Sequence, residues 1–132
     1  TAAAALAAAA VAATALAAPA DAQAGCKTRA CKIRVTDRQC SQERPKACVM
    51  HVIHRKRLTG WRRAWMLRIP WCESRWNPWA VSRGGHVGLY QFARSTWATT
   101  PYRRRWIFSA RWQAFAAAWM LAQGRAGEWA CR

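Results

Sequence analysis

One carboxylate stands out among the side chains of this chain that could do acid–base chemistry. From Trp61 to the C-terminus there are only two acidic residues, Glu73 and Glu128, among many arginines and tryptophans. A carboxyl group that protonates a leaving oxygen near neutral pH needs a raised pKa, which apolar rings and the C-terminal end of a helix both favour. Trp71 and Trp76 are expected to supply those rings, whereas nearby arginines act in the opposite direction. We therefore expect Glu73 to be the catalytic carboxylate.

The helix that must carry Glu73 is readable from the apolar spacing. Apolar side chains recur every three or four residues from residue 61 to about 74, which predicts a helix. Glu73 follows Ile69 by one turn, and Pro70 is expected to kink the helix just before it. The members of the apolar series are Trp61, Ala64, Trp65, Ile69 and Cys72.

The other elements must support this helix. We predict helices from Pro45 to about 57 and from about 109 to 123, the second ended by Gly124. Residues 77–88 are rich in turn formers and are expected to form a loop or short irregular hairpin. Because no strand pattern is visible, the predicted fold class is mainly α. The last helix has an apolar stripe expected to face the core, made of Trp112, Phe115, Ala116, Trp119 and Met120.

The residues around and after Glu73 form a spaced motif: Glu73, Ser74, Pro78, Ala80, Ser82, Gly85, Gly88, Leu89, Gln91 and Thr96. In type and spacing the motif resembles the transglycosylase (SLT-type) domains of bacterial cell-wall enzymes, which have a small lysozyme-like fold with disulfides. The resemblance runs from about residue 61 to 132. Cys72 before the motif and the terminal Trp-x-Cys are also similar to the resuscitation-promoting-factor branch. The chain departs from the family pattern at Tyr90, Arg94, His86 and Pro70.

The resemblance implies a reaction and roles for several residues. It implies cleavage of the β-1,4 bond between N-acetylmuramic acid and N-acetylglucosamine, with Glu73 as single acid–base group and a 1,6-anhydromuramyl product. Gln91 would bind the sugar, Ser82 would support the catalytic region, and Tyr90 and Thr96 would line the cleft. The alternative for Ser82 is a structural role, in which its hydroxyl stabilises a turn. No metal and no cofactor is implied.

The short segment around Thr96 has a structural alternative of its own. Thr96 and Ser95 are both good capping residues, and Pro101 follows soon after them. They are therefore expected to cap a short helix that ends before Pro101.

Other functions stay open at this stage. Ordinary glycosidases use two carboxylates, and Glu128 is expected to be a poor second one because it lies beside Cys131 near the C-terminus. A muramidase-type hydrolase is the near alternative, and a non-catalytic, cationic wall-binding or membrane-active protein is the alternative of another class. His86 is expected to be a surface loop histidine, with a second acid–base role as its alternative.

The cysteines and the first residues indicate an exported protein. Residues 1–24 are Ala-rich and end in Ala-Gln-Ala, which is typical of an export signal, with a buried or transmembrane helix as the alternative. Six cysteines follow, an even number that favours three disulfides. Cys72 and Cys131 are expected to pair, as the resemblance also implies, whereas the pairing among Cys26, Cys31, Cys40 and Cys48 stays open. We divide the rest into a basic, Cys-rich extension at 25–60 and a transglycosylase-like domain at 61–132.

A zinc site is a rival interpretation of the N-terminal part. Cys48, His51 and His54 have the right ligand types, but their spacing is cramped. The preferred interpretation places both histidines on a solvated basic face with the Arg55–Arg57 run.

The charge predicts the partners. The chain has 22 Lys and Arg against 5 Asp and Glu, a net charge of +17. Such a charge favours an anionic partner. For an exported chain we expect peptidoglycan glycan strands and anionic cell-wall polymers, and no nucleic acid, although nucleic-acid binding would also suit the charge. The expected protein is a secreted, wall-associated monomer with no membrane span after removal of the signal.

Overall fold

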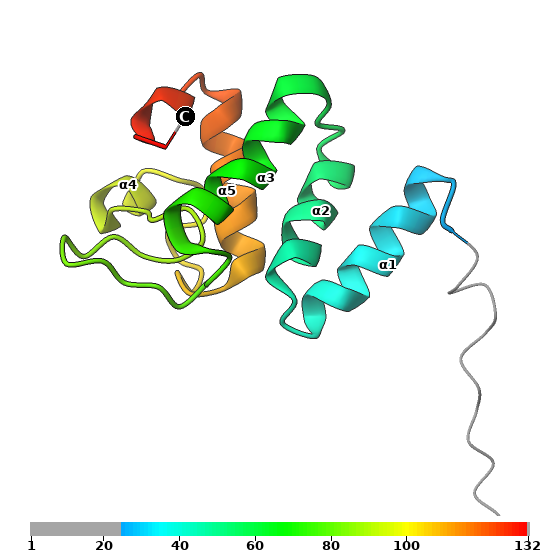
Figure 1. Cartoon of the computed structure of the whole chain (residues 1–132), viewed down its shortest axis with the longest axis horizontal. Helices are drawn as coiled ribbons and strands as arrows, with labels where there is room; N and C mark the ends of the chain where they lie inside the picture. The colour runs from blue at the N-terminus through cyan, green and yellow to red at the C-terminus, as the bar shows by residue number, and fades with distance from the viewer. Residues whose placement is uncertain (1–24, 132) are drawn as a thin grey trace, which may run out of the picture.

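The computed structural model describes residues 25–131, and the predicted export signal at residues 1–24 lies outside them (Figure 1). The described part is mainly helical, with isolated β-bridges but no strand, which confirms the predicted fold class. Its elements are α1 (Arg29–Ser41), α2 (Pro45–Arg55), α3 (Gly60–Ser74), α4 (Arg94–Ala98), α5 (Ala110–Ala122) and a 3-10 turn, η2 (Ala126–Glu128). None of the described helices is long and apolar enough to cross a membrane.

Local signals explain where α2 and α3 begin and end. α2 starts at Pro45, whose fixed φ suits the first helical turn. The chain then turns at Arg57, which has positive φ, and Gly60, the first residue of α3, has positive φ as well. α3 continues through Pro70 to Ser74, so the proline does not end it. Both predicted helices are confirmed, to within two residues at their ends.

The hydrophobic core lies where α2, α3 and α5 meet the loop that follows α3. α2 contributes Val49, Val52 and Ile53, all buried, to the same core as α3 and α5. The packing therefore does not divide at residue 60, and a functional boundary there stays a prediction. α1 buries only Cys40 and packs against α2, beyond the core (Figure 1).

The predicted core face of α5 is partly wrong. Ala116 and Met120 are buried as expected, but Trp112, Phe115 and Trp119 are only partly buried at the edge of the core. The buried face also contains one polar residue, Gln113, and a leucine, Leu121. Its remaining members are small: Ala114, Ala117 and Ala118. α5 is apolar on almost every side, so its apolar period cannot show which side is innermost.

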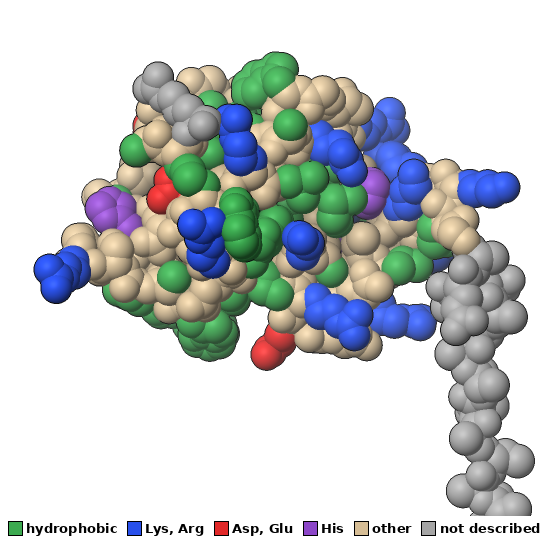
Figure 2. Space-filling view, viewed as in Figure 1, with side chains coloured by type: hydrophobic (Ala, Val, Ile, Leu, Met, Phe, Trp, Pro, Cys, Tyr) green, Lys and Arg blue, Asp and Glu red, His purple; other side chains and the backbone are tan. Residues whose placement is uncertain are grey.

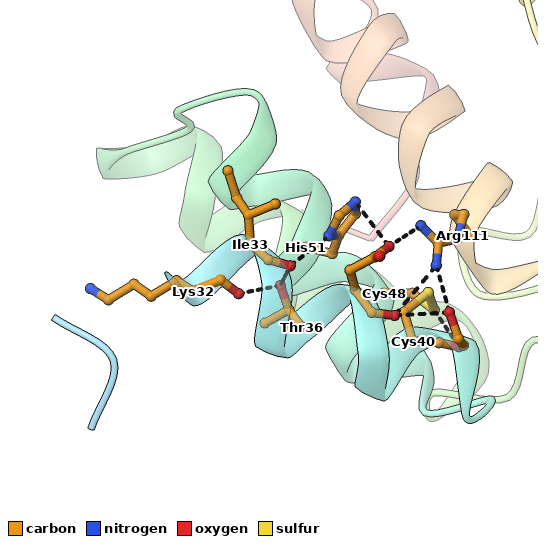
Figure 3. A network of polar contacts seen from close by, with 9 residues as sticks. Lys32, Ile33, Thr36, Cys40, Cys48, His51 and Arg111 are labelled. Atoms are coloured by element: carbon orange, nitrogen blue, oxygen red, sulfur yellow. Dashed lines mark hydrogen bonds and ion pairs between the residues drawn. A yellow bond between two sulfur atoms is a disulfide. The ribbon is translucent and has the colours of Figure 1, made fainter. Parts of the chain in front are cut away.

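A polar network joins α1 to α2 and α5. The Arg111 guanidinium donates to the Asp37 carboxylate at 2.6 Å and to the Ser41 hydroxyl at 3.2 Å. His51 lies 3.7 Å from the same carboxylate through Nε2, and its Nδ1 lies 3.3 Å from the Ile33 carbonyl. Figure 3 shows His51 and Arg111 pointing toward the same stretch of α1. The arginine holds the pKa of Asp37 below its usual value, and burial lowers the pKa of His51.

This network corrects the expectation for His51. The residue is 4% exposed and so does not lie on the solvated basic face, whereas His54 is partly exposed. The zinc interpretation also fails, because the Cys48 sulfur is bonded to Cys40 and is not a free thiolate ligand.

Three disulfides tie the described chain. They join Cys26 to Cys31, Cys40 to Cys48, and Cys72 to Cys131. The first two are local, closing loops at the start of α1 and between α1 and α2. The third connects the end of α3 to the tail beyond η2, residues that are 59 apart in sequence. It therefore brings the C-terminal segment beside Glu73.

Basic side chains cover much of the surface. Figure 2 shows Lys and Arg side chains spread over the face in view, with isolated acidic side chains between them. This distribution agrees with the net charge of +17.

Candidate active site

The end of α3 is shaped so that Glu73 is held in place. Glu73 is the second-last residue of α3, and the next two residues after Ser74, Arg75 and Trp76, both have positive φ (+53° and +65°). The Ser74 hydroxyl donates to the Pro70 carbonyl (3.0 Å) and also lies 3.1 Å from the Leu89 carbonyl. The last turn of the helix is thus hydrogen-bonded to the loop that contains Leu89.

Glu73 lines a cavity of about 460 Å³. The predicted residues Ser82, Gln91 and Thr96 line the same cavity, so the structure brings them together with Glu73, although their roles stay predictions. His86 and Glu128 complete the polar part of the lining. No Lys or Arg lies among the described residues that form it, in a chain of net charge +17. Among residues 25–131, the lining of the cavity thus carries two carboxylates and no guanidinium.

The apolar wall of the cavity is not the one expected. Trp71 is 54% exposed with the Arg75 guanidinium 4.4 Å from its ring centroid, and neither Trp71 nor Trp76 lines the cavity. The apolar part comes instead from Phe92, Met120 and Trp129, with Ala93 and Ala130. Trp71 lies two residues from Glu73 along a helix, which places its side chain on a different side of α3.

Gln91 has an unusual backbone conformation. Its φ is +48°, a value that a non-glycine residue adopts only where the surroundings hold it. The side-chain nitrogen donates to the carbonyls of Gly88 (3.0 Å) and Ala80 (3.3 Å). Because both hydrogen bonds use the nitrogen, they orient the amide, and its oxygen accepts no hydrogen bond from the described residues.

Ser82 and His86 form a tight turn at the cavity rim. The His86 backbone N–H donates to the Ser82 hydroxyl (3.1 Å), and the Ser82 N–H donates to the His86 carbonyl (3.0 Å). The Ser82 hydroxyl also lies 3.4 Å from His86 Nδ1. Ser82 therefore has the turn role considered above and also faces the cavity. His86 is an exposed loop histidine that lines the same rim.

Tyr90 does not line the cleft, so that assignment was wrong. The side chain is fully buried, its hydroxyl donates to the Met66 carbonyl at 3.0 Å, and its ring stacks with Trp65. Burial raises its pKa well above the usual value. A tyrosine at this position fills the core beneath the loop, because the loop turns Gln91 outward and Tyr90 inward.

Thr96 lines the cavity but does not cap α4. Ala93 is the N-cap residue of α4, without a side-chain cap, and both Ser95 and Thr96 lie inside the helix. The capping expectation is therefore wrong, although a short helix before Pro101 is present.

Gln113 is a positioning residue that the motif does not contain. It is fully buried in α5 and hydrogen-bonds three backbone groups of the surrounding loops. Its oxygen accepts from the Leu89 N–H (2.8 Å), and its nitrogen donates to the carbonyls of Pro78 (3.1 Å) and Ile107 (2.7 Å). The available signal was a single amide on a helix whose other side chains, apart from Arg111, are apolar, since buried polar groups need partners.

Glu128, which was expected to be a poor second carboxylate, is a cavity residue that the motif does not contain. It lies on η2, next to the segment that the Cys72–Cys131 disulfide draws toward α3, and it lines the same cavity as Glu73. Arg125 binds its carboxylate with two N–H groups, from Nε at 2.5 Å and Nη2 at 3.0 Å. Arg125 also donates to the Thr99 hydroxyl at 3.0 Å, which fixes the pair beside the cavity.

Comparison with known proteins agrees with this geometry. Searches of curated proteins and of solved structures gave no significant match. Residues 52–117, half of the 132-residue chain, match the family described as the Transglycosylase SLT domain. The matched segment contains Glu73, the loop with Ser82 and Gln91, and Gln113. The chain therefore belongs to the Transglycosylase SLT domain family, whose lysozyme-like fold acts on peptidoglycan.

Proposed function

We propose that the protein is a lytic transglycosylase that cleaves the N-acetylmuramic acid–N-acetylglucosamine bond with Glu73 as its single acid–base group. The observation that carries the proposal is the position of Glu73 in a cavity that it lines together with the oriented amide of Gln91, with no Lys or Arg among the lining residues that the structure describes. Apolar rings of Phe92 and Trp129 form part of the same cavity. A carboxyl group that lines such a cavity is placed to give a proton to a bound glycosidic oxygen and to take one back.

The proposed reaction needs one carboxyl group and no water. Glu73 gives its proton to the glycosidic oxygen as the bond from that oxygen to the muramyl anomeric carbon breaks. The resulting carboxylate takes the proton of the muramyl 6-hydroxyl, whose oxygen attacks the same carbon. Glu73 ends protonated, and the products are a 1,6-anhydromuramyl end and a free N-acetylglucosamine 4-hydroxyl. Gln91 would hold the sugar beside the scissile bond.

Glu128 supports a second candidate, hydrolysis. A hydrolase needs a second carboxylate to activate water or act as nucleophile, and Glu128 lines the cavity. Both of its oxygens already accept hydrogen bonds from Arg125, and binding a water to activate it would compete with these bonds. We therefore assign Glu128 to binding or shaping the cavity and keep Glu73 as the catalyst.

Two matched variants test the assignment. Glu73→Gln and Glu128→Gln each remove one carboxylate and preserve the side-chain shape. With purified peptidoglycan, Glu73→Gln should lower the rate of glycan release by about 10²–10⁴-fold, the usual contribution of a general acid. Glu128→Gln should keep most of the rate. Equal losses from both variants would favour a two-carboxylate hydrolase, and no loss from Glu73→Gln would contradict the proposal.

The setting of the activity is part of the same proposal. The basic surface suits the carboxylates and phosphates of cell walls, and the predicted export signal would deliver the protein there as a secreted monomer. The relation to the resuscitation-promoting-factor branch also remains a proposal. If Glu73→Gln binds peptidoglycan as tightly as the original chain and neither protein releases glycan, the protein is instead a cationic wall-binding protein.

A further inference from the structure

Exposed tryptophans in this protein fall into two groups. In the first group a guanidinium lies over the ring, with Arg62 5.6 Å from the Trp61 centroid and Arg75 4.4 Å from that of Trp71. In the second group no Lys or Arg of residues 25–131 lies over the ring. The exposed fractions of all four are similar: Trp61 62%, Trp71 54%, Trp79 53% and Trp106 60%. The two groups therefore differ in what covers the ring and not in exposure.

The second group forms one cluster with Phe108, which we call the aromatic corner. Trp79 stacks on Phe108 with centroids 5.5 Å apart and planes 18° apart. Trp106 meets Trp79 edge to face, at 5.0 Å and 73°. Phe108 is partly buried against the core, so the corner has a fixed base. One face of Trp79 is covered by Phe108, and the indoles of Trp79 and Trp106 stand nearly perpendicular to each other.

The aromatic corner lines a cavity of about 340 Å³ in which a ligand can bind. This cavity shares none of its lining residues with the Glu73 cavity. Its polar groups include Glu43 and Ser109. Arg111 also lines it, but the guanidinium is already bound to Asp37. The cavity thus combines two exposed indoles with hydrogen-bonding groups and holds no unpaired cation among its described lining residues.

These features select a ligand class. An anionic ligand would need a free cation, which the cavity lacks, although the rest of the surface is strongly basic. A β-1,4-linked ring of the gluco configuration, such as N-acetylglucosamine, carries its substituents equatorially and presents C–H groups on both ring faces. Such C–H groups pack on the electron-rich face of an indole, while hydroxyl or acetamido groups can bond to Glu43 and Ser109. We propose that the aromatic corner is a second binding site for the N-acetylhexosamine rings of a glycan strand.

The corner is built into the loop that also forms the catalytic cavity. Trp79 lies between Pro78, whose carbonyl accepts from Gln113 at 3.1 Å, and Ala80, whose carbonyl accepts from Gln91 at 3.3 Å. One ordered loop thus presents Trp79 to the corner and Gln91 to the cleft. A polymer offers many identical rings, so a second site raises its affinity through local concentration. The inference rests on the proposed function only for the identity of the glycan.

Indole NMR signals test the site directly. The Glu73→Gln protein is titrated with chitotriose, an uncharged β-1,4-linked saccharide, and the indole N–H signals are assigned by single Trp→Phe variants. Trp79 and Trp106 signals should shift with the saccharide. Trp61 and Trp71 signals, which are equally exposed but covered by arginine, should not. Shifts confined to Trp61 and Trp71, or absent from all four tryptophans, would overturn the proposal.

Binding to insoluble peptidoglycan gives the second readout. The double variant Trp79→Ala/Trp106→Ala in the Glu73→Gln protein should bind about tenfold more weakly, on the scale of two lost aromatic contacts. Trp61→Ala/Trp71→Ala is the matched control and should change binding less than about twofold. Both double variants alter exposed side chains, so thermal unfolding should show that they fold. Equal effects of the two pairs would contradict a specific site.

The outcomes separate this inference from the proposed function. Saccharide shifts at the corner in a chain that releases no glycan would support the corner and refute the catalytic proposal. Glycan release without corner shifts would do the reverse. Concentration-dependent self-association that the Trp79→Ala/Trp106→Ala change abolishes, without saccharide binding, would show that a second copy of the chain occupies the corner and would overturn the proposal.

Discussion

Gly88→Ala should destabilise the protein more than an alanine at another glycine of positive φ, and it should disturb the loop that forms the site. Gly88 has φ +80°, and a Cβ there would lie 2.3 Å from the Gln113 side-chain nitrogen and 2.5 Å from its Cδ and Oε1. Gln113 cannot move aside without breaking contacts, because its side chain is fully buried and hydrogen-bonded to three backbone groups. The variant must either displace Gln113 or move the loop that carries Gln91.

The expected loss of stability follows from these contacts. An alanine at positive φ costs about 1–2 kcal/mol. Displacing Gln113 breaks three hydrogen bonds, each with a net value of about 1 kcal/mol. The sum is about 4–5 kcal/mol, a large part of the 5–15 kcal/mol that stabilises a typical domain. Gly88→Ala should therefore unfold at much lower urea concentration and lose its glycan-releasing activity.

Gly85 provides a matched control. Its φ is +79°, but nothing lies within 4 Å of a Cβ built there, so Gly85→Ala should cost only the backbone term of about 1–2 kcal/mol. Urea unfolding of both variants measures the difference, expected at about 3 kcal/mol. Introducing Gly88→Ala into a Gln113→Ala protein should cost no more than Gly85→Ala, since the clash partner is gone. Equal losses for Gly85→Ala and Gly88→Ala in the original chain would refute the reasoning.

Three further predictions concern the connections between elements and the buried His51. Replacing Cys72 and Cys131 together by alanine should lower the free energy of unfolding by about 4 kcal/mol, because the bridge closes a loop of residues 59 apart; an unchanged urea midpoint would contradict this. Arg111→Ala should destabilise the chain by about 1 kcal/mol near pH 7. Since Arg111 lowers the pKa of Asp37, this stabilisation is full above the usual aspartate pKa of 3.8 and is lost as the pH falls below it, so the two proteins should converge in acid unfolding. Burial lowers the pKa of His51, so stability should also fall as the pH drops below 6.5, in both proteins, as thermal unfolding against pH would show.

Much of the fold was predictable because its helix signals are local. Pro45 marks the start of α2, the apolar spacing marks α3, and Gly124, at φ +73°, follows the end of α5. The face of α5 was not predictable, because alanines and aromatic residues on all its sides leave no polar stripe. The close packing of α2 and α3 around α5 buries the small residues and leaves the large rings at the edge.

The cavity residues that belong to the sequence motif could be predicted. The side chains whose direction depends on contacts with distant parts of the chain could not. Glu73, Ser82, Gln91 and Thr96 meet at one cavity, as the motif suggests. The inward direction of Tyr90 depends on Gln113 and Ser74, which hold Leu89 from distant parts of the chain. Glu128 reaches the cavity in a tail that is disulfide-bonded to α3. The pairing of Cys72 with Cys131 was predicted, but whether the Glu128 side chain enters the cavity depends on the local fold of η2.

The most direct test of the central claim is the source of oxygen in the released glycan ends. Purified peptidoglycan is digested in water enriched in heavy oxygen, and the products are analysed by mass spectrometry beside those of Glu73→Gln. Attack by the muramyl 6-hydroxyl predicts anhydromuramyl ends that lack one water and contain no heavy oxygen, made only when Glu73 is present. Reducing ends that carry heavy oxygen would show that water is the nucleophile and would contradict the transglycosylase mechanism.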